Sequence, residues 1–155
     1  MERREFLKTS GAIVVCACAG SSTSACKMIS GVSDTPTAPS GSYQVSDSEV
    51  MLDLNKVSVL DKVGASIKIE IENEKHHPLK IIVARVGSSE YIAFSNKCTH
   101  GERELEYEHN SRSFTCVSFG HSKFDIKGVV LDGPAEKPVQ LFPVSLSDNK
   151  LQIIV

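Results

Sequence analysis

The chain has 155 residues, 41% of them hydrophobic and 23% charged, which allows one ordinary domain with a short appendage but not two cores. Its formal net charge of −2 gives no reason to expect binding to nucleic acid or anionic lipid through bulk electrostatics. Of the five cysteines, Cys16, Cys18 and Cys26 lie near the start and only Cys98 and Cys116 lie in the body, so their spacing is not that of a disulfide framework.

Residues 1–29 are predicted to be a targeting or anchor segment. Arg3-Arg4, followed by Phe6-Leu7-Lys8, resembles a twin-arginine export signal, and residues 11–20 form a mildly apolar run of signal length. That run is too short to cross a bilayer comfortably, since about 20 apolar residues are needed. We expect export to the periplasm or the outer face of the cytoplasmic membrane, with membrane association through the N-terminus. The alternative is a cytosolic chain with a basic N-terminus.

The end of this segment has three readings. Thr23-Ser24-Ala25-Cys26 is a weak lipobox, which would make Cys26 a lipidated first residue. Ala17-Cys18-Ala19 offers ordinary cleavage instead, and the segment could also be retained as a short anchor. We favour lipidation at Cys26. Residues 30–42 are rich in Ser, Thr, Gly and Pro and lack hydrophobic periodicity, which predicts a flexible linker before a single domain over residues 43–155.

The domain is predicted to be all-β. Short β-prone runs lie at 50–54, 57–60, 66–72, 79–86, 91–94, 104–108, 112–115, 139–146 and 150–155. One of them alternates strictly, with Ile67, Ile69 and Ile71 apolar, as a half-buried strand should. Ser147-Asp148-Asn149 is a predicted hairpin turn. Regularly spaced short strands favour a small antiparallel sandwich or barrel.

Two loops carry residues that bind metals. Cys98-Thr99-His100 directs a thiolate and an imidazole towards one place from a single turn. After the intervening residues 101–115, where His109-Asn110-Ser111 is predicted to turn a hairpin, Cys116 and His121 supply a second pair. A hairpin would bring the two loops face to face. Two thiolates and two imidazoles suit either a mononuclear zinc ion or a [2Fe–2S] cluster.

These residues resemble the Rieske family. Cys98-Thr99-His100 matches its first cluster loop, and Ser122-Lys123-Phe124-Asp125 matches the stretch after its second. Gly133-Pro134-Ala135, followed by Pro138 and Val139, is similar to the loop that covers the cluster. The resemblance implies a Rieske-like antiparallel sandwich or barrel with a small cluster-binding subdomain. It also implies one [2Fe–2S] cluster per subunit.

By this resemblance Cys98, His100, Cys116 and His121 are the expected ligands. Ser122, Gly133 and Pro134 are expected to surround them, with Ser122 as a hydrogen-bond donor to a bridging sulfide. The family's second loop is usually Cys-x-x-His-Gly, but here Phe119 stands at the histidine position and His121 follows two residues later. Gly120 is expected to give the longer loop its backbone freedom. The alternative is that His121 is a polar loop residue and another group completes the site.

Two further departures concern the reduction potential. Family members of the cytochrome bc type have an additional cysteine in each loop, which form a disulfide, whereas Glu102, Arg103, Val117 and Ser118 occupy these surroundings here. High-potential members also use a tyrosine hydroxyl as a donor to a ligand sulfur, and Phe124 stands at that place. Fewer donors to sulfur lower the potential. We therefore expect a value in the lower or middle part of the Rieske range of roughly −150 to +300 mV.

The function implied by the resemblance is electron transfer, as an exported subunit of a quinol-oxidising respiratory complex with quinol and cytochrome b- or c-type partners. The chain is expected to be an electron-transfer subunit rather than an enzyme on its own, and no catalytic residue is assigned. Alternatives are a free-standing periplasmic or lipid-anchored Rieske ferredoxin, or a zinc-binding or clusterless module. His76, His77 and His109 are interpreted as solvated turn residues, and the charged run 102–108 as a solvated strand face.

Overall fold

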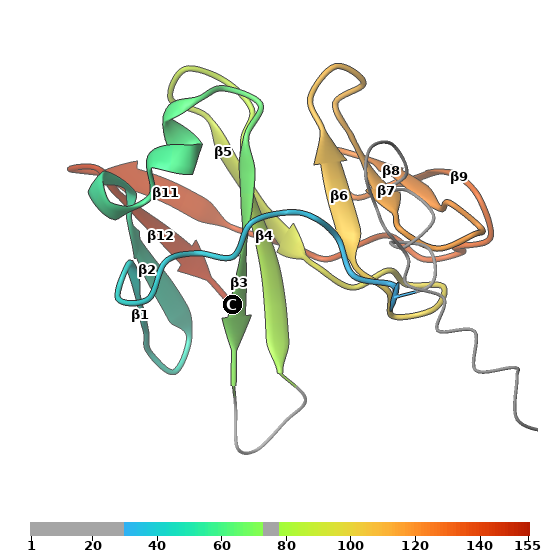
Figure 1. Ribbon diagram of the computed structural model, residues 1–155, viewed down its shortest axis with the longest axis horizontal. Coiled ribbons are helices and arrows are strands. Elements are labelled where there is room, and N and C mark those ends of the chain that lie inside the picture. The colour runs from blue at the N-terminus through green and yellow to red at the C-terminus, as the bar shows by residue number, and fades with distance from the viewer. Residues whose placement is uncertain (1–29, 73–77) are drawn as a thin grey trace, which may run out of the picture.

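The structure, a computed structural model, describes residues 30–72 and 78–155, and these residues form strands joined by loops and two short 3-10 helices (Figure 1). The strands are β1 (Tyr43–Val45), β2 (Glu49–Asp53), β3 (Ser66–Ile71), β4 (Leu79–Arg85), β5 (Tyr91–Ser95), β6 (Leu105–Glu108), β7 (Ser113–Cys116), β8 (Lys123–Asp125), β9 (Val130–Asp132), β10 (Leu141–Phe142), β11 (Val144–Ser147) and β12 (Lys150–Ile154). The 3-10 helices are η1 (Leu54–Lys56) and η2 (Ser58–Asp61). The all-β prediction is confirmed, since none of the elements in the described ranges is an α-helix.

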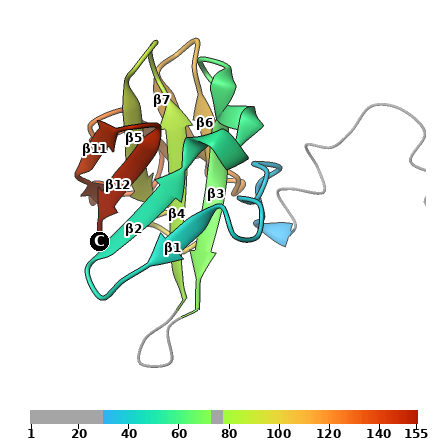
Figure 2. The same cartoon turned by 90° about the vertical axis from the view of Figure 1, so that its left-hand side faces the viewer.

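The strands form three antiparallel sheets. Their orders are β1-β2-β12-β11, β10-β5-β4-β3 and β6-β7-β8-β9. Figure 2 shows the first sheet in front of the second, and Figure 1 shows the third beside them. The third sheet, together with its loops, is the small subdomain that the family resemblance implies.

The second sheet is buried on both faces. Successive side chains of a strand point to opposite faces, and in β4 Ile81 and Val83 pack in one core while Ile82 packs in the other. The first core fills the space between the first two sheets. The second contains Phe94 of β5, Phe114 of β7 and the cysteines. Cys98 and Cys116 are therefore part of an apolar core that packs on the second sheet.

Two strand predictions are wrong in part. Residues 57–60 were expected to be extended, but the Leu60 amide donates to the Val57 carbonyl at 3.0 Å, which is the i to i+3 pattern of a 3-10 turn. The predicted strand 139–146 is two strands, because Pro143 has no N–H to continue a ladder. β10 pairs with β5 and β11 with β12, so the chain changes sheets there. The predicted turn is confirmed, with positive φ at both Asp148 and Asn149.

The segment 30–42, predicted as a flexible linker, is packed on the domain. Ser33, Thr35 and Ala38 are buried. The Ala38 amide donates to the Lys68 carbonyl, and the Lys68 amide to the Pro36 carbonyl, each at 2.8 Å. β3 is an edge strand, so its outer backbone groups are available for such pairing. In Figure 1 the blue segment runs from beside the third sheet, across β3, to β1.

Candidate metal centre

Three loops meet at one end of the third sheet: residues 96–104 after β5, 117–122 after β7, and 133–140 after β9. The predicted hairpin is confirmed, since β6 pairs with β7 and Leu105 is opposite Cys116. This pairing brings the second loop to the first, and the Val117 amide donates to the Glu104 carbonyl at 3.1 Å. The Thr99 hydroxyl donates to the Lys137 carbonyl at 2.7 Å, which joins the first loop to the third.

The third loop covers the second at very close range, as expected from the glycine and proline there. Gly133 has φ +90°, and a Cβ on it would lie 2.6 Å from Ser122 Cα. Only glycine fits both the conformation and the space. Pro134 packs on Gly120, where a Cβ would lie 2.9 Å from the proline ring. The Ala135 amide donates to Ser122 Oγ at 3.2 Å, so Ser122 fixes the covering loop.

The two cysteines lie together in the core beneath these loops. Cys98 and Cys116 are each 1% exposed and neither forms a disulfide. The pKa of Cys98 is lowered to about 5, chiefly by a hydrogen bond from the Cys116 thiol and in part by the backbone amides of His100 and Gly101 and the Ser122 side chain, against the effect of burial. The same hydrogen bond and burial raise the pKa of Cys116. Cys98 is therefore the more acidic of the two thiols, and metal binding would release the remaining protons of the pair.

Hydroxyl and amide groups lie around the two sulfurs. Hydrogen bonds to ligand sulfur stabilise negative charge and tune a cluster's potential. Ser122 was expected to serve a bridging sulfide, and here its hydroxyl is directed to Cys98. Ser118, whose Oγ lies 3.2 Å from Cys116 Sγ, was not singled out from the sequence. A serine two residues after a candidate ligand cysteine was the available signal.

The structure does not gather the two candidate histidines with the cysteine pair. His100 and His121 are exposed on the two loops, and no group of three or more His, Cys, Asp or Glu side chains gathers as a metal site within the described ranges. His121 itself has φ +44°, and its amide donates to the Ser118 carbonyl at 3.1 Å. The residue of the long loop with left-handed backbone is thus His121 and not Gly120. Gly120 is needed instead because a side chain there would collide with Pro134. Phe119 is 72% exposed.

Of the other histidines considered from the sequence, only His109 is among the described residues. His109 is part of the β6–β7 turn, where its Nδ1 lies 3.1 Å from the Tyr107 hydroxyl. His76 and His77 lie outside the described residues, as do Cys26 and the rest of the targeting segment. The two loops together offer a buried pair of free cysteines, Cys98 and Cys116, and two exposed histidines, His100 and His121. This set fits a [2Fe–2S] cluster with two thiolate and two imidazole ligands.

An all-β fold, a buried cysteine pair on two facing loops and a third loop closing over them define a small protein built to hold a metal centre through thiolates. The sequence model of the Rieske [2Fe-2S] domain matches residues 52–143, more than half of the chain, and the chain belongs to this family. Membership implies a [2Fe–2S] cluster and electron transfer through it.

One solved structure supports the fold, and two others are similar at lower scores. The ferredoxin of carbazole 1,9a-dioxygenase from Nocardioides aromaticivorans IC177 is 22% identical, with a TM-score of 0.50 over 62% of this chain and 91% of that one. A complex of reduced oxygenase and oxidized ferredoxin in carbazole 1,9a-dioxygenase is 22% identical, with a TM-score of 0.49 over 60% of this chain and 82% of that one. The plasma membrane Rieske protein PetC3 from Synechocystis PCC 6803 is 20% identical, with a TM-score of 0.44 over 57% of this chain and 86% of that one. No curated protein matches the chain.

Proposed function

We propose that the chain is an exported Rieske electron-transfer protein that binds one [2Fe–2S] cluster through Cys98, His100, Cys116 and His121. The observation that carries this assignment is the buried Cys98–Cys116 pair, surrounded by hydrogen-bonding groups from two loops and closed by a third. A cysteine whose pKa is lowered, beside a second free thiol, favours binding of a cation, because thiolate is the form that ligates metals. A solvated turn or a structural disulfide would not need this arrangement.

The exposed histidines offer the route by which electrons would enter or leave the site. When bound, the cluster supplies one-electron transfer, and imidazole ligands raise its potential relative to four thiolates. His100 and His121 lie on exposed loop positions, so a partner can approach them without disturbing the buried sulfurs. This combination suits the oxidation of a quinol, which gives up protons with its electrons.

We place the protein in a quinol-oxidising respiratory complex with a cytochrome b- or c-type partner. A free-standing ferredoxin is the second candidate, favoured by the absence of a disulfide between the loops, since Cys98 and Cys116 are free and no other described residue is a cysteine. Co-purification with a b-type haem, or a neighbouring gene for cytochrome b, supports the complex. Purification as a single haem-free chain that does not oxidise quinol supports the ferredoxin.

Membrane association would come from the N-terminus. In the described ranges no helix is long and apolar enough to cross a bilayer. Gly31 accepts a hydrogen bond from the Glu104 amide at 3.0 Å, so the described chain begins beside the first cluster loop. An extended chain spans at most about 3.6 Å per residue, so lipidation at Cys26 would hold this end of the domain within roughly 20 Å of the membrane. A membrane-bound quinol would then be within reach.

The test is an EPR spectrum of the reduced full-length protein beside two histidine variants. We expect the low average g value of mixed histidine and cysteine ligation, and its loss or change in His121→Ala. The matched control is His109→Ala, which removes a loop imidazole that contacts Tyr107 and should leave the spectrum unaltered. Zinc in place of iron, or an unchanged spectrum in His121→Ala, would overturn the ligand assignment.

A further inference from the structure

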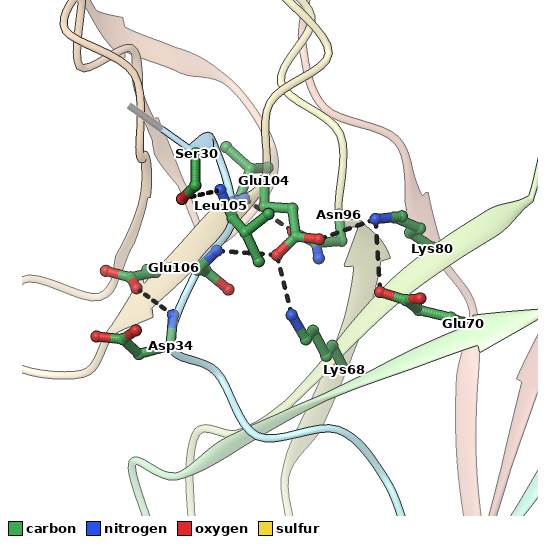
Figure 3. Close-up of polar contacts among 11 residues, drawn as sticks. Ser30, Asp34, Lys68, Glu70, Lys80, Asn96, Glu104, Leu105 and Glu106 are labelled. Carbon is green, nitrogen blue, oxygen red and sulfur yellow. Dashed lines mark hydrogen bonds and ion pairs between the residues drawn. The ribbon is translucent and has the colours of Figure 1, made fainter. Parts of the chain in front are cut away.

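The carboxylate of Glu104 is buried where the cysteine-bearing loops meet the second sheet. Its side chain was expected to be part of a solvated face, but the residue is 4% exposed. Its oxygens accept hydrogen bonds from the Ser33 amide at 2.9 Å, from Lys68 Nζ at 3.2 Å and from Lys80 Nζ at 2.9 Å. Figure 3 shows Glu104 between the two lysines, which come from β3 and β4. The carboxylate thus joins the first cluster loop, the N-terminal segment and the second sheet.

The charges of this cluster are mutually dependent. Lys68 is itself buried, while Lys80 is partly exposed and also pairs with Glu70 at 3.4 Å. Burial works to raise the pKa of Glu104, but the hydrogen bonds from Ser33, Lys80 and Lys68 outweigh it and hold that pKa below its ordinary value. The hydrogen bond to Glu104 likewise raises the pKa of Lys80. The Glu104 carboxylate is therefore an anion at neutral pH, and it is held between the side chains of Lys68 and Lys80.

The backbone next to this carboxylate holds both cysteine-bearing loops. The Cys98 amide donates to the Arg103 carbonyl at 2.8 Å, and the Val117 amide donates to the Glu104 carbonyl at 3.1 Å. Val117 directly follows Cys116. The Leu105 amide donates to Asn96 Oδ1 at 2.8 Å, which closes the first loop on itself. Two consecutive carbonyls, those of residues 103 and 104, therefore receive one amide from each loop.

We propose that Glu104 is a positioning residue for the cluster: it anchors the two carbonyls that hold the cysteine loops, and it places a fixed negative charge behind them. This inference rests on the proposed function for its redox consequence, but not for its structural one. A negative charge near the site disfavours the reduced, more negative form, so it lowers the reduction potential. An anchored pair of carbonyls limits the separation of the two cysteines.

The experiment compares Glu104→Gln with Glu70→Gln in the full-length protein. Both remove one carboxylate from the same ion cluster, but Glu70 is 44% exposed in its side chain and pairs only with Lys80 among the described residues. For Glu104→Gln we expect a higher reduction potential than for Glu70→Gln. We also expect hydrogen exchange at the Cys98 and Val117 amides to be faster by on the order of tenfold, because local opening costs less. Equal potentials together with equal exchange rates in the two variants would overturn the proposal.

The exchange measurement needs no cluster, so it separates this inference from the ligand assignment. A protein that binds no iron would sink the proposed function, yet faster exchange in Glu104→Gln would still support the positioning role. If Glu104→Gln does not fold, Lys68→Met combined with Glu104→Gln leaves no buried ion unpaired. The double variant should still show faster exchange at both amides, and unaltered exchange would overturn the proposal. Glu104→Asp, which keeps the charge, should retain a potential closer to that of the natural protein than Glu104→Gln does.

Discussion

The Ser122 hydroxyl is directed to the Cys98 sulfur while it accepts a hydrogen bond from the Ala135 amide, so one buried side chain links all three loops of the site. Each loop comes from a different connection between strands. A single serine therefore fixes the covering loop and also adjusts the charge on a sulfur.

Ser122→Ala should lower the reduction potential. A hydrogen bond to ligand sulfur stabilises the more negative reduced state, and its loss should cost about 1 kcal/mol, or roughly 40 mV for one electron. The measurement is a redox titration followed by EPR. Ser113→Ala is the control, because Ser113 is equally buried but bonds to Ser111 and not to a cysteine. A shift as large in the control would show that the effect is only structural.

Phe119→His should restore a cluster that His121→Ala has lost. Phe119 stands at the position of the usual ligand and is exposed, so the substitution should cost little stability. We expect the double variant to bind iron and to recover an EPR signal, with His121→Ala alone as the reference. Full iron content and an unaltered spectrum in His121→Ala alone would show instead that His121 is not a ligand.

Stability should fall in acid partly because of Glu104. Its folded pKa lies below the unfolded value of about 4.3, so its contribution is present above that value and is lost as pH falls through the folded pKa. Glu104→Gln removes this dependence and leaves Lys68 without its buried partner, which should cost about 3–5 kcal/mol at pH 7.

Urea unfolding of the metal-free full-length protein at two pH values measures this difference. The gap between Glu104→Gln and the natural protein should be large at neutral pH and should narrow once the glutamate is protonated. Glu70→Gln, which breaks an exposed ion pair, should cost less than about 1 kcal/mol. A gap for Glu104→Gln that is the same at both pH values would contradict the expectation.

Export should depend on the arginine pair. Replacing Arg3 and Arg4 by lysine should leave the protein in the cytoplasm, whereas Cys26→Ser should allow export but release the protein from the membrane fraction if Cys26 is lipidated. Fractionation and immunoblotting measure both. Cys18→Ser is the control for Cys26, since it changes a neighbouring cysteine outside the lipobox. Membrane association that survives Cys26→Ser would point to a retained anchor.

Much of the fold could be predicted because a strand of sufficient length has a recognisable local sequence pattern. Alternation at Ile67, Ile69 and Ile71 predicts β3, and the Asp148-Asn149 turn is where it was expected. Short strands such as β1, β8 and β9 were missed, since three residues contain too few alternations to be recognised. The 57–60 run, rich in β-branched residues, became a 3-10 turn because its hydrogen bonds are made within the turn.

The sequence by itself determined which residue types the site offers: two Cys–His loops and a glycine-proline loop in one order, which are local motifs that can be recognised without the three-dimensional structure. Only the tertiary structure decided how these parts are held. The packing of residues 30–42, the burial of Glu104 between Lys68 and Lys80, and the meeting of Ser122 with Cys98 depend on strands far apart in sequence. A charged run looks the same in a sequence whether water or two buried lysines surround it, because burial is a property of the assembled sheets.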